Sequence, residues 1–464
     1  MIRWGALSLL AAAMLAAPGT SAGEFGGKSG VLPLGTQIDN EALLQPDEIF
    51  SSEAHGGAKP YAVKLGDLAF NGSATLGGAA RQAGISCATC HINGTTNALL
   101  YIPGMSSRPG NFDTTGPVFN PDADDHLVNP LTIPSLRGIR FLAPYGHNGR
   151  FASLRDFVHN VIVNEFSGPE PSPAILDAIV VYLQDIDFQP NPRLGPLGRL
   201  TGRMTDAEAH GQALFLKPFP GDPTMSCATC HVPSAAFVDH LQHDVGTGGL
   251  FKTPTLLNAD FNAPYFHDGR YDTYDQVVAY FDRTFALGLS GADRQDLVSY
   301  LHAVGTGEHP YDADGVDYRM QEIEEFDSVL DVAVPRQDGA VVALAVDTIG
   351  GELREFAEEY PGYQDAAVSG GEVERGKARA ALKNLVLDLR AVDMAMSEPR
   401  PETAMTLLSI YHGDLRDAVP LLQAAVPWSL FNPAIHDTHF AALKKLYASA
   451  IDPLADLQVP VDRD

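Results

Sequence analysis

The sequence predicts a mainly α-helical chain built from two similar modules and a third helical unit. Three observations support this fold class: a short motif and a longer segment each occur twice, helical periodicity recurs, and strand patterns are scarce between Gly- and Pro-rich loops. At ~150 residues per domain, 464 residues suggest about three domains. Hydrophobic residues at 45% and charged residues at 19% are typical of ordered globular proteins.

The first 22 residues have the pattern of a signal peptide. Arg3 precedes an apolar stretch at 5–17, and Thr20, Ser21 and Ala22 form a small-residue cleavage pattern. The stretch is short for a membrane span, and no later segment reaches ~18 uninterrupted apolar residues. An uncleaved N-terminal anchor is the alternative. We expect an exported, periplasmic protein with a cleaved signal peptide and no membrane span afterwards.

All four cysteines lie in two C-x-x-C-H motifs. Two thiols at this spacing can bond the two vinyl groups of one haem, and the following histidine becomes the proximal iron ligand. A zinc ribbon, a thioredoxin-type dithiol and two disulfides are the alternatives, but none requires a histidine after both pairs. The sequence therefore predicts two covalently bound haem c groups, held by Cys87, Cys90 and His91 and by Cys227, Cys230 and His231.

A 17-residue repeat accompanies the motifs. Residues 134–150 and 254–270 align without a gap, with nine identical positions. Apolar-periodic stretches follow each copy and predict helices at 151–166, 174–186, 271–285 and 292–304. Thr205 and Glu208 form a capping-box pattern that opens another helix. Each module is therefore expected to be a small cytochrome c-like haem domain, the first at residues 23–195 and the second at 196–309.

Residues 310–464 contain no cysteine and no recognisable motif. They hold 28 acidic and 13 basic residues, and the whole chain holds 58 and 31, a net charge of −27. Nucleic acid and anionic membranes are thus excluded as expected partners. Helical periodicity occurs at 373–394, 401–411, 415–425 and 436–450, and glycine pairs at 350–351 and 370–371 are expected to separate helices. We expect an acidic helical accessory domain that serves as a cap, a docking surface for a cationic partner or a homodimer contact.

The order C-x-x-C-H, T-P-T-L and A-P-Y-F-H-D-G-R resembles the di-haem cytochrome c peroxidase family, which includes the methylamine-utilisation di-haem oxidase branch. The resemblance covers roughly residues 55–310 and is most specific at 253–270. It implies two haems that face each other across a domain interface, one reacting with peroxide and the other receiving electrons. Family members often bind a calcium ion between the domains, for which this sequence indicates no ligand.

The resemblance also implies a catalytic carboxylate at Glu165. Such a group can take a proton from the near oxygen of bound peroxide and return it to the far oxygen; an ordinary helix-end glutamate is the alternative. A catalytic glutamine of the family falls on Phe157, and a tryptophan between the haems falls on His147. Since neither side chain is retained, the resemblance leaves both of these functions without a residue.

The sixth iron ligands remain open. The stretch that holds a distal histidine in some family members has none here, but Met105 could serve in its place. Phe281 occupies the family's ligand position on the second haem, and the neighbouring Tyr280 could bind after a small register shift. Further candidates are His147, His159, His240, His243 and His267.

Arg150 and Arg270 end the two copies of the repeat. Their guanidinium groups suit the propionates of the haems. The alternative is a salt bridge to a nearby aspartate such as Asp156 or Asp272.

These residues predict a peroxidase that reduces hydrogen peroxide to water with electrons from a small donor protein of the cytochrome c or cupredoxin type. Two alternatives remain: a di-haem oxidase that modifies a protein or an organic substrate, and a di-haem electron-transfer protein without catalysis.

Overall fold

The computed structural model describes residues 32–33, 35–38, 47–116, 118–122, 124–307, 315–362, 368–397, 401–439 and 441. The expected signal peptide, the boundary at 309/310 and most of the stretch 436–450 lie outside the described residues. Among those described, no helix is both long and apolar enough to cross a membrane.

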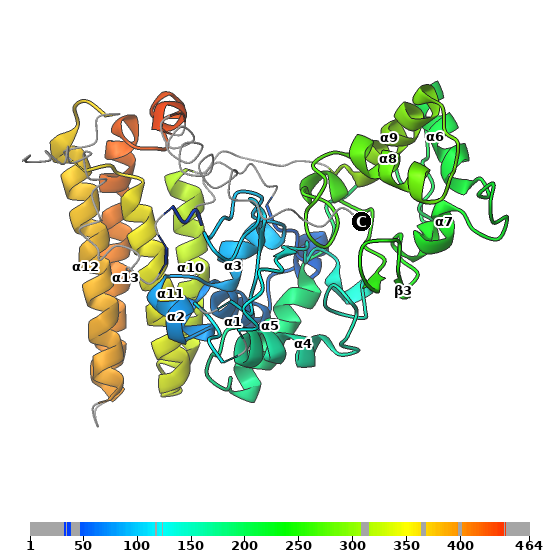
Figure 1. The fold of residues 1–464 in the computed structure, drawn as a ribbon. Coiled ribbons are helices and arrows are strands. Elements are labelled where there is room, and N and C mark those ends of the chain that lie inside the picture. The colour runs from blue at the N-terminus through cyan, green and yellow to red at the C-terminus, as the bar shows by residue number, and fades with distance from the viewer. Residues whose placement is uncertain are drawn as a thin grey trace, which may run out of the picture.

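The expectation of a mainly helical chain is confirmed. The only ladders in the described part are two antiparallel pairs, β1 (Asn111–Phe112) with β2 (Leu131–Thr132), and β3 (Gln242–His243) with β4 (Phe251–Lys252). The helices of the C-terminal third stand side by side at one end of the molecule, the first module lies in the middle and the second module at the other end (Figure 1). The domain boundary at 195/196 stays a prediction.

In the first module, α1 crosses α5 at a glycine. A Cβ at Gly66 would lie 2.1 Å from the carbonyl oxygen of Ala178, so only glycine allows this approach. Tyr182, on the same face of α5, lies beside the crossing. The helices of this module are α1 (Tyr61–Asn71), α2 (Gly78–Gln82), α3 (Cys87–Cys90), α4 (Leu154–Asn160) and α5 (Pro173–Asp185).

The second module repeats this crossing between α6 and α9. A Cβ at Gly211 would lie 2.1 Å from the carbonyl oxygen of Asp296, again with a tyrosine, Tyr300, beside it. The predicted capping box of Thr205 and Glu208 opens α6. The helices are α6 (Asp206–Leu216), α7 (Cys227–Cys230), α8 (Tyr274–Thr284) and α9 (Gly291–Gly305).

The four helices predicted after the repeats are confirmed, with one difference. The stretch 151–166 is α4 followed by a π-helical turn at Val161–Glu165, which the apolar pattern did not indicate. Such turns are often found at functional sites. The turn places Glu165 at the end of the helix.

The C-terminal third contains α10 (Val316–Ala333), α11 (Gly339–Glu358), α12 (Glu372–Met396) and α13 (Pro401–Ala425). The sequence analysis missed α10 and α11 and divided α13 in two. The expectation that the glycine pair at 350–351 separates helices is wrong, because both residues lie inside α11, where Gly350 is buried by packing. The pair at 370–371 does precede a helix, and Gly371 caps α12 with a φ of 69°.

Three clusters of buried apolar side chains form the core. The cluster of the C-terminal helices also includes Leu65 and Leu68 of α1 and Ala178 of α5. Thr348 of α11 donates a hydrogen bond to the carbonyl of Leu68 at 3.2 Å. The C-terminal helices are therefore built onto the first module through α1 and α5.

Candidate functional site

The first C-x-x-C-H motif forms the short helix α3. Ser86 caps this helix, and the Thr89 hydroxyl accepts a hydrogen bond from the Ser86 N–H at 3.0 Å. The imidazole of His91 has its Nδ1 3.0 Å from the carbonyl oxygen of Pro134, the first residue of the repeat. This contact fixes the tautomer and leaves Nε2 for a metal.

The second motif, at α7, is built in the same way. Ser226 and Thr229 reproduce the cap, and His231 Nδ1 lies 3.3 Å from the carbonyl oxygen of Phe237. Burial lowers the pKa of His91 to about 4 and also lowers the pKa of His231. Both imidazoles are therefore neutral near pH 7, as a metal ligand must be.

The donor set fits one haem c at each motif. None of the four cysteines is joined to another by a disulfide, which does not support the two-disulfide alternative. Among the described residues, the only group of His, Cys, Asp or Glu close enough to share an ion includes just one of these cysteines, so the two pairs do not form a zinc ribbon. Each pair of thiols is instead followed by a neutral histidine with Nδ1 engaged.

The two copies of the repeat join the modules through reciprocal hydrogen bonds. The Thr132 N–H donates to the carbonyl of His267 at 2.7 Å, and the Lys252 N–H donates to the carbonyl of His147 at 3.0 Å. Thr132 and Lys252 occupy equivalent positions, as do His147 and His267. The modules therefore exchange the same bond in both directions.

A second pair of bonds follows the same symmetry. Asn111 Nδ2 donates to the carbonyl of Asp268 at 2.8 Å, and Gln242 Nε2 donates to the carbonyl of Asn148. The Lys252 ammonium adds bonds to two carbonyls of the first module, at 2.9 and 3.0 Å. Burial lowers the pKa of Lys252 to about 8.

His147 lies where this interface meets the first module. Its Nε2 is 2.8 Å from the carbonyl oxygen of Thr132, and burial lowers its pKa to about 4. Smaller reductions of that pKa come from His267 and Lys252 across the interface. His267 instead stacks on Phe251, with ring centroids 3.7 Å apart. His147 Nε2 is thus engaged by a backbone carbonyl, and iron ligation by His147 stays a prediction.

Glu165 lies in a polar site at the end of the π-helical turn. Arg150 Nη2 donates to its Oε1 at 2.6 Å, and Asn160 Nδ2 donates to the same oxygen at 3.0 Å. Burial raises the pKa of Glu165, and the Arg150 charge partly offsets that increase. The carboxyl is 19% exposed. Sequence reasoning singled out both residues but missed their contact.

The two repeat arginines have carboxylate partners other than the aspartates that the sequence suggested. Arg150 pairs with Glu165, and Arg270 pairs with Asp268 through Nε and Nη2. Asp272 is bound by Arg108. Pairing of either arginine with a haem propionate stays a prediction.

The equivalent position in the second module carries no carboxylate. The π-helical turn adds one residue to the first module, so Phe166 and Phe285 end the two helices with nearly the same backbone conformation, at φ −104° and −103°. The exposed Thr284 therefore stands where Glu165 stands in the first module. The two modules therefore share a scaffold but differ in the chemistry of this position.

The candidate sixth ligands are held by other contacts. Met105 is 1% exposed and packs in the core of the first module. The Tyr280 hydroxyl donates to the carbonyl of Val245 at 2.6 Å. His159 pairs with Glu170 at 2.9 Å, and His240 Nδ1 lies 2.7 Å from the carbonyl oxygen of Ala143. Iron ligation by any of them stays a prediction.

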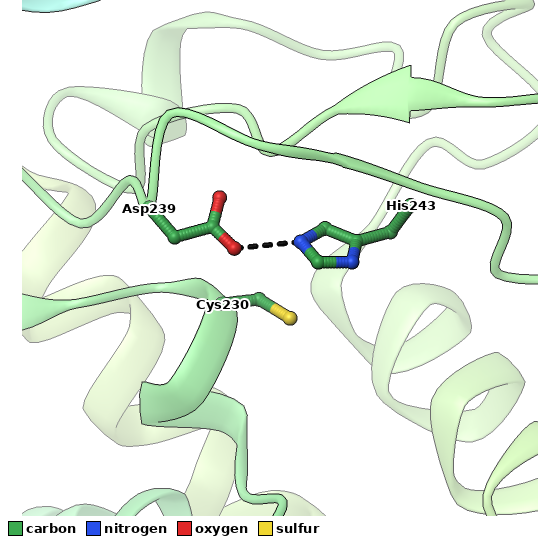
Figure 2. A group of neighbouring side chains, drawn as sticks. All are labelled: Cys230, Asp239 and His243. Carbon is green, nitrogen blue, oxygen red and sulfur yellow. Dashed lines mark hydrogen bonds and ion pairs between the residues drawn. The ribbon is translucent and has the colours of Figure 1, made fainter.

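His243 faces Asp239 beside the second motif (Figure 2). Its Nε2 is 2.6 Å from Asp239 Oδ2, and the Cys230 sulfur lies close enough for the three to hold an ion. Because Cys230 is one of the two thiols that suit a haem thioether bond, we do not assign a separate ion to this group.

Residues 206–309 match the sequence profile of the family described as di-haem cytochrome c peroxidase. This match confirms the resemblance derived from the motifs. The matched residues belong to the second module, and the first module resembles it through the shared motif, repeat and helix crossing.

Three similar proteins indicate the range of related chains. Hydrazine synthase subunit gamma of Kuenenia stuttgartiensis is 26% identical over 59% of this chain and 84% of its own length. Cytochrome c peroxidase Ccp of Escherichia coli is 36% identical over 19% of this chain and 21% of its own. Methylamine utilization protein MauG of Methylorubrum extorquens is 34% identical over 18% and 24%.

Proposed function

We propose that this chain is a di-haem peroxidase that reduces hydrogen peroxide to water with electrons from a small donor protein of the cytochrome c or cupredoxin type. Its haem c groups would be held by the two C-x-x-C-H motifs, with His91 and His231 as proximal ligands. When bound, haem iron supplies the redox chemistry and a binding position for peroxide. The family match at residues 206–309 supports this class of chemistry.

The observation that carries the proposal is the difference between Glu165 and Thr284 at equivalent positions of the two modules. A carboxylate held by an arginine and an asparagine can accept and return a proton, whereas a threonine hydroxyl is not a base near neutral pH. The first module is therefore proposed to react with peroxide, and the second to receive electrons from the donor.

Glu165 would act as the acid–base residue. Arg150 and Asn160 both bind Oε1, which fixes the orientation of the carboxyl. Burial raises the pKa of Glu165 toward the working pH, while Arg150 favours the ionised form that accepts a proton. Arg150 is thus proposed as a positioning residue for Glu165.

The reciprocal interface would hold the modules in one mutual orientation. It joins the last residues of β2 and β4 to the histidine of the opposite repeat. Hydrogen bonds through backbone groups tolerate little displacement, which suits electron transfer between two fixed sites. A periplasmic location, a calcium ion between the modules, and a homodimer through residues 310–464 belong to this proposal as predictions from the sequence.

An electron paramagnetic resonance spectrum of the oxidised protein, before and after one equivalent of hydrogen peroxide, tests the proposal. We expect a high-spin ferric signal that disappears on addition of peroxide, and turnover of peroxide with a reduced small cytochrome. Two low-spin signals that peroxide does not change, in either the oxidised or the partly reduced protein, would contradict a peroxidase. Such a spectrum would favour an electron-transfer protein without catalysis.

A further inference from the structure

Tyr182 is a buried phenol beside the first haem-attachment motif. Its side chain is 1% exposed, and its hydroxyl donates a 2.8 Å hydrogen bond to Glu48 Oε1. Among the groups that raise the pKa of Tyr182 are burial, Glu48 and the thiol of Cys87, so the ring lies near that cysteine. A phenol with a carboxylate partner is thereby placed close to the haem-attachment residues.

Phe70 connects this tyrosine to the proximal histidine. The ring centroid of Phe70 is 6.4 Å from that of His91 and 5.2 Å from that of Tyr182. Phe50 covers the tyrosine from another direction, with centroids 5.9 Å apart. Closely spaced aromatic rings therefore extend from the iron ligand to the phenol.

Glu48 is placed to take the phenolic proton. Burial raises the pKa of Glu48, so it is a stronger base than an exposed glutamate, whereas Lys59 and Arg137 lower that pKa and favour its ionised form. Lys59 is itself fixed by Asp67 at 3.3 Å and Glu325 at 2.7 Å. This network supplies a base next to the hydroxyl.

The second module contains a matched tyrosine without such a base. Tyr300 lies at the equivalent helix crossing, is also 1% exposed, and has its ring 5.1 Å from Phe215. Burial and the neighbouring Cys227 raise the pKa of Tyr300, and the charge of Arg199 lowers it. Within the described part of the chain, no carboxylate is bonded to the Tyr300 hydroxyl. The Tyr182–Glu48 pair is therefore specific to the module that carries Glu165.

We propose that Tyr182 is a redox-active residue that supplies one electron to the first haem site, with Glu48 as its proton acceptor. This inference rests on the proposed peroxidase function. Reduction of hydrogen peroxide to water consumes two electrons, of which the second module would provide one and Tyr182 the other.

The step is balanced within the chain. With hydrogen peroxide as the oxidant at the first module, one electron would leave the Tyr182 ring for that site and the hydroxyl proton would pass to Glu48 Oε1. The products are a neutral tyrosyl radical and a protonated Glu48. An electron from the donor protein, together with return of the proton from Glu48, restores the pair.

The test is paramagnetic resonance of the full-length haem-loaded protein, frozen at intervals after peroxide is added without a donor. We expect a tyrosyl radical whose line shape narrows when the protein is made with ring-deuterated tyrosine. Tyr182→Phe should remove the signal, and the matched control Tyr300→Phe should retain it. Glu48→Gln, which keeps an acceptor oxygen but cannot take a proton, should slow radical formation by about 100-fold.

A second arm separates this inference from the peroxidase proposal. A photochemically generated one-electron oxidant replaces peroxide, so the arm does not depend on any reaction with peroxide. A Tyr182 radical in this arm alone would support the redox pair while contradicting the peroxidase. A radical that survives Tyr182→Phe, or that is lost equally in Tyr300→Phe, would overturn the inference. If Tyr182→Phe loses its haem, the deuterated wild-type sample still shows whether a tyrosyl radical forms. Absence of a tyrosyl radical from the wild-type protein in both arms would also overturn the inference.

Discussion

The backbone N–H of Thr132 donates a 2.7 Å hydrogen bond to the carbonyl of His267, which joins the two modules through their repeated segments. Thr132 lies two residues before Pro134, whose carbonyl oxygen contacts His91, the proposed iron ligand. One short segment therefore orients the imidazole of His91 and also binds the other module. A displacement of the second module would change the position of that imidazole.

Glu165→Gln is expected to reduce turnover of hydrogen peroxide by about 10²- to 10⁴-fold, because the amide cannot accept and return a proton. Both haems should stay attached, as neither motif contacts the carboxyl. Steady-state kinetics with a reduced cytochrome and a haem-to-protein ratio would measure the two effects. Glu170→Gln is the matched control, since the Glu170 side chain is 72% exposed and pairs with His159. Normal turnover in the Glu165 variant would remove it from the mechanism.

Arg150→Met is expected to raise the pKa of Glu165, because the arginine charge is the largest influence that lowers it. If catalysis needs the ionised carboxylate, the acid limb of the pH profile of kcat/KM should move to higher pH. Arg155→Met provides the control, because Arg155 forms an exposed pair with Asp177. An unchanged acid limb would separate Arg150 from the protonation of Glu165.

Gly66→Ala is expected to destabilise the first module by about 1–3 kcal/mol, because the new methyl group would overlap the backbone of α5. The Cβ would lie 2.1 Å from the Ala178 carbonyl oxygen. Gly376→Ala is a sharp control, since nothing lies within 4 Å of a Cβ at that exposed position of α12. Denaturant unfolding should show a loss for the first variant and none for the second; equal stabilities would mean that the crossing can relax.

Asp327→Asn is expected to stabilise the protein at alkaline pH and to have little effect near pH 4. Asp327 is 4% exposed, and burial raises its pKa from 3.8 to about 8. The folded state then binds the proton more tightly than the unfolded state, so stability falls as pH rises from about 4 to about 8. Thermal unfolding of both proteins across that range would show a growing difference in Tm. A constant difference would mean that Asp327 titrates normally.

Local patterns were enough to predict much of this chain. The capping box at Thr205 and the helices after each repeat depend on residues close in sequence, and the structure agrees with them. By contrast, α11 begins with an unbroken apolar run at 340–346, and a short apolar run alone does not distinguish a helix from a buried strand. In the sequence, the glycine pair at 350–351 resembles the end of a helix. Only the packing shows that both glycines lie inside α11.

The contact between Arg150 and Glu165 could not be predicted in the same way. The two residues are separated by a helix and a π-helical turn, and their distance depends on how that turn is wound. Likewise, Glu48 and Tyr182 are far apart in sequence and meet only after α5 has packed on α1. Sequence periodicity indicates faces of helices, but it does not indicate which polar groups the folded chain brings together.

The attachment of the C-terminal helices to α1 makes the two halves of the duplication unequal. Seven residues of α1 are buried, from Val63 to Phe70, whereas its counterpart α6 buries only Glu208, Gly211 and Phe215. The C-terminal helices thus cover the outer side of α1, whereas the corresponding side of α6 is exposed to solvent. Removal of the first module, or its replacement by a copy of the second, would expose the apolar side chains of the C-terminal helices that pack on α1 and α5. The two modules are therefore not interchangeable.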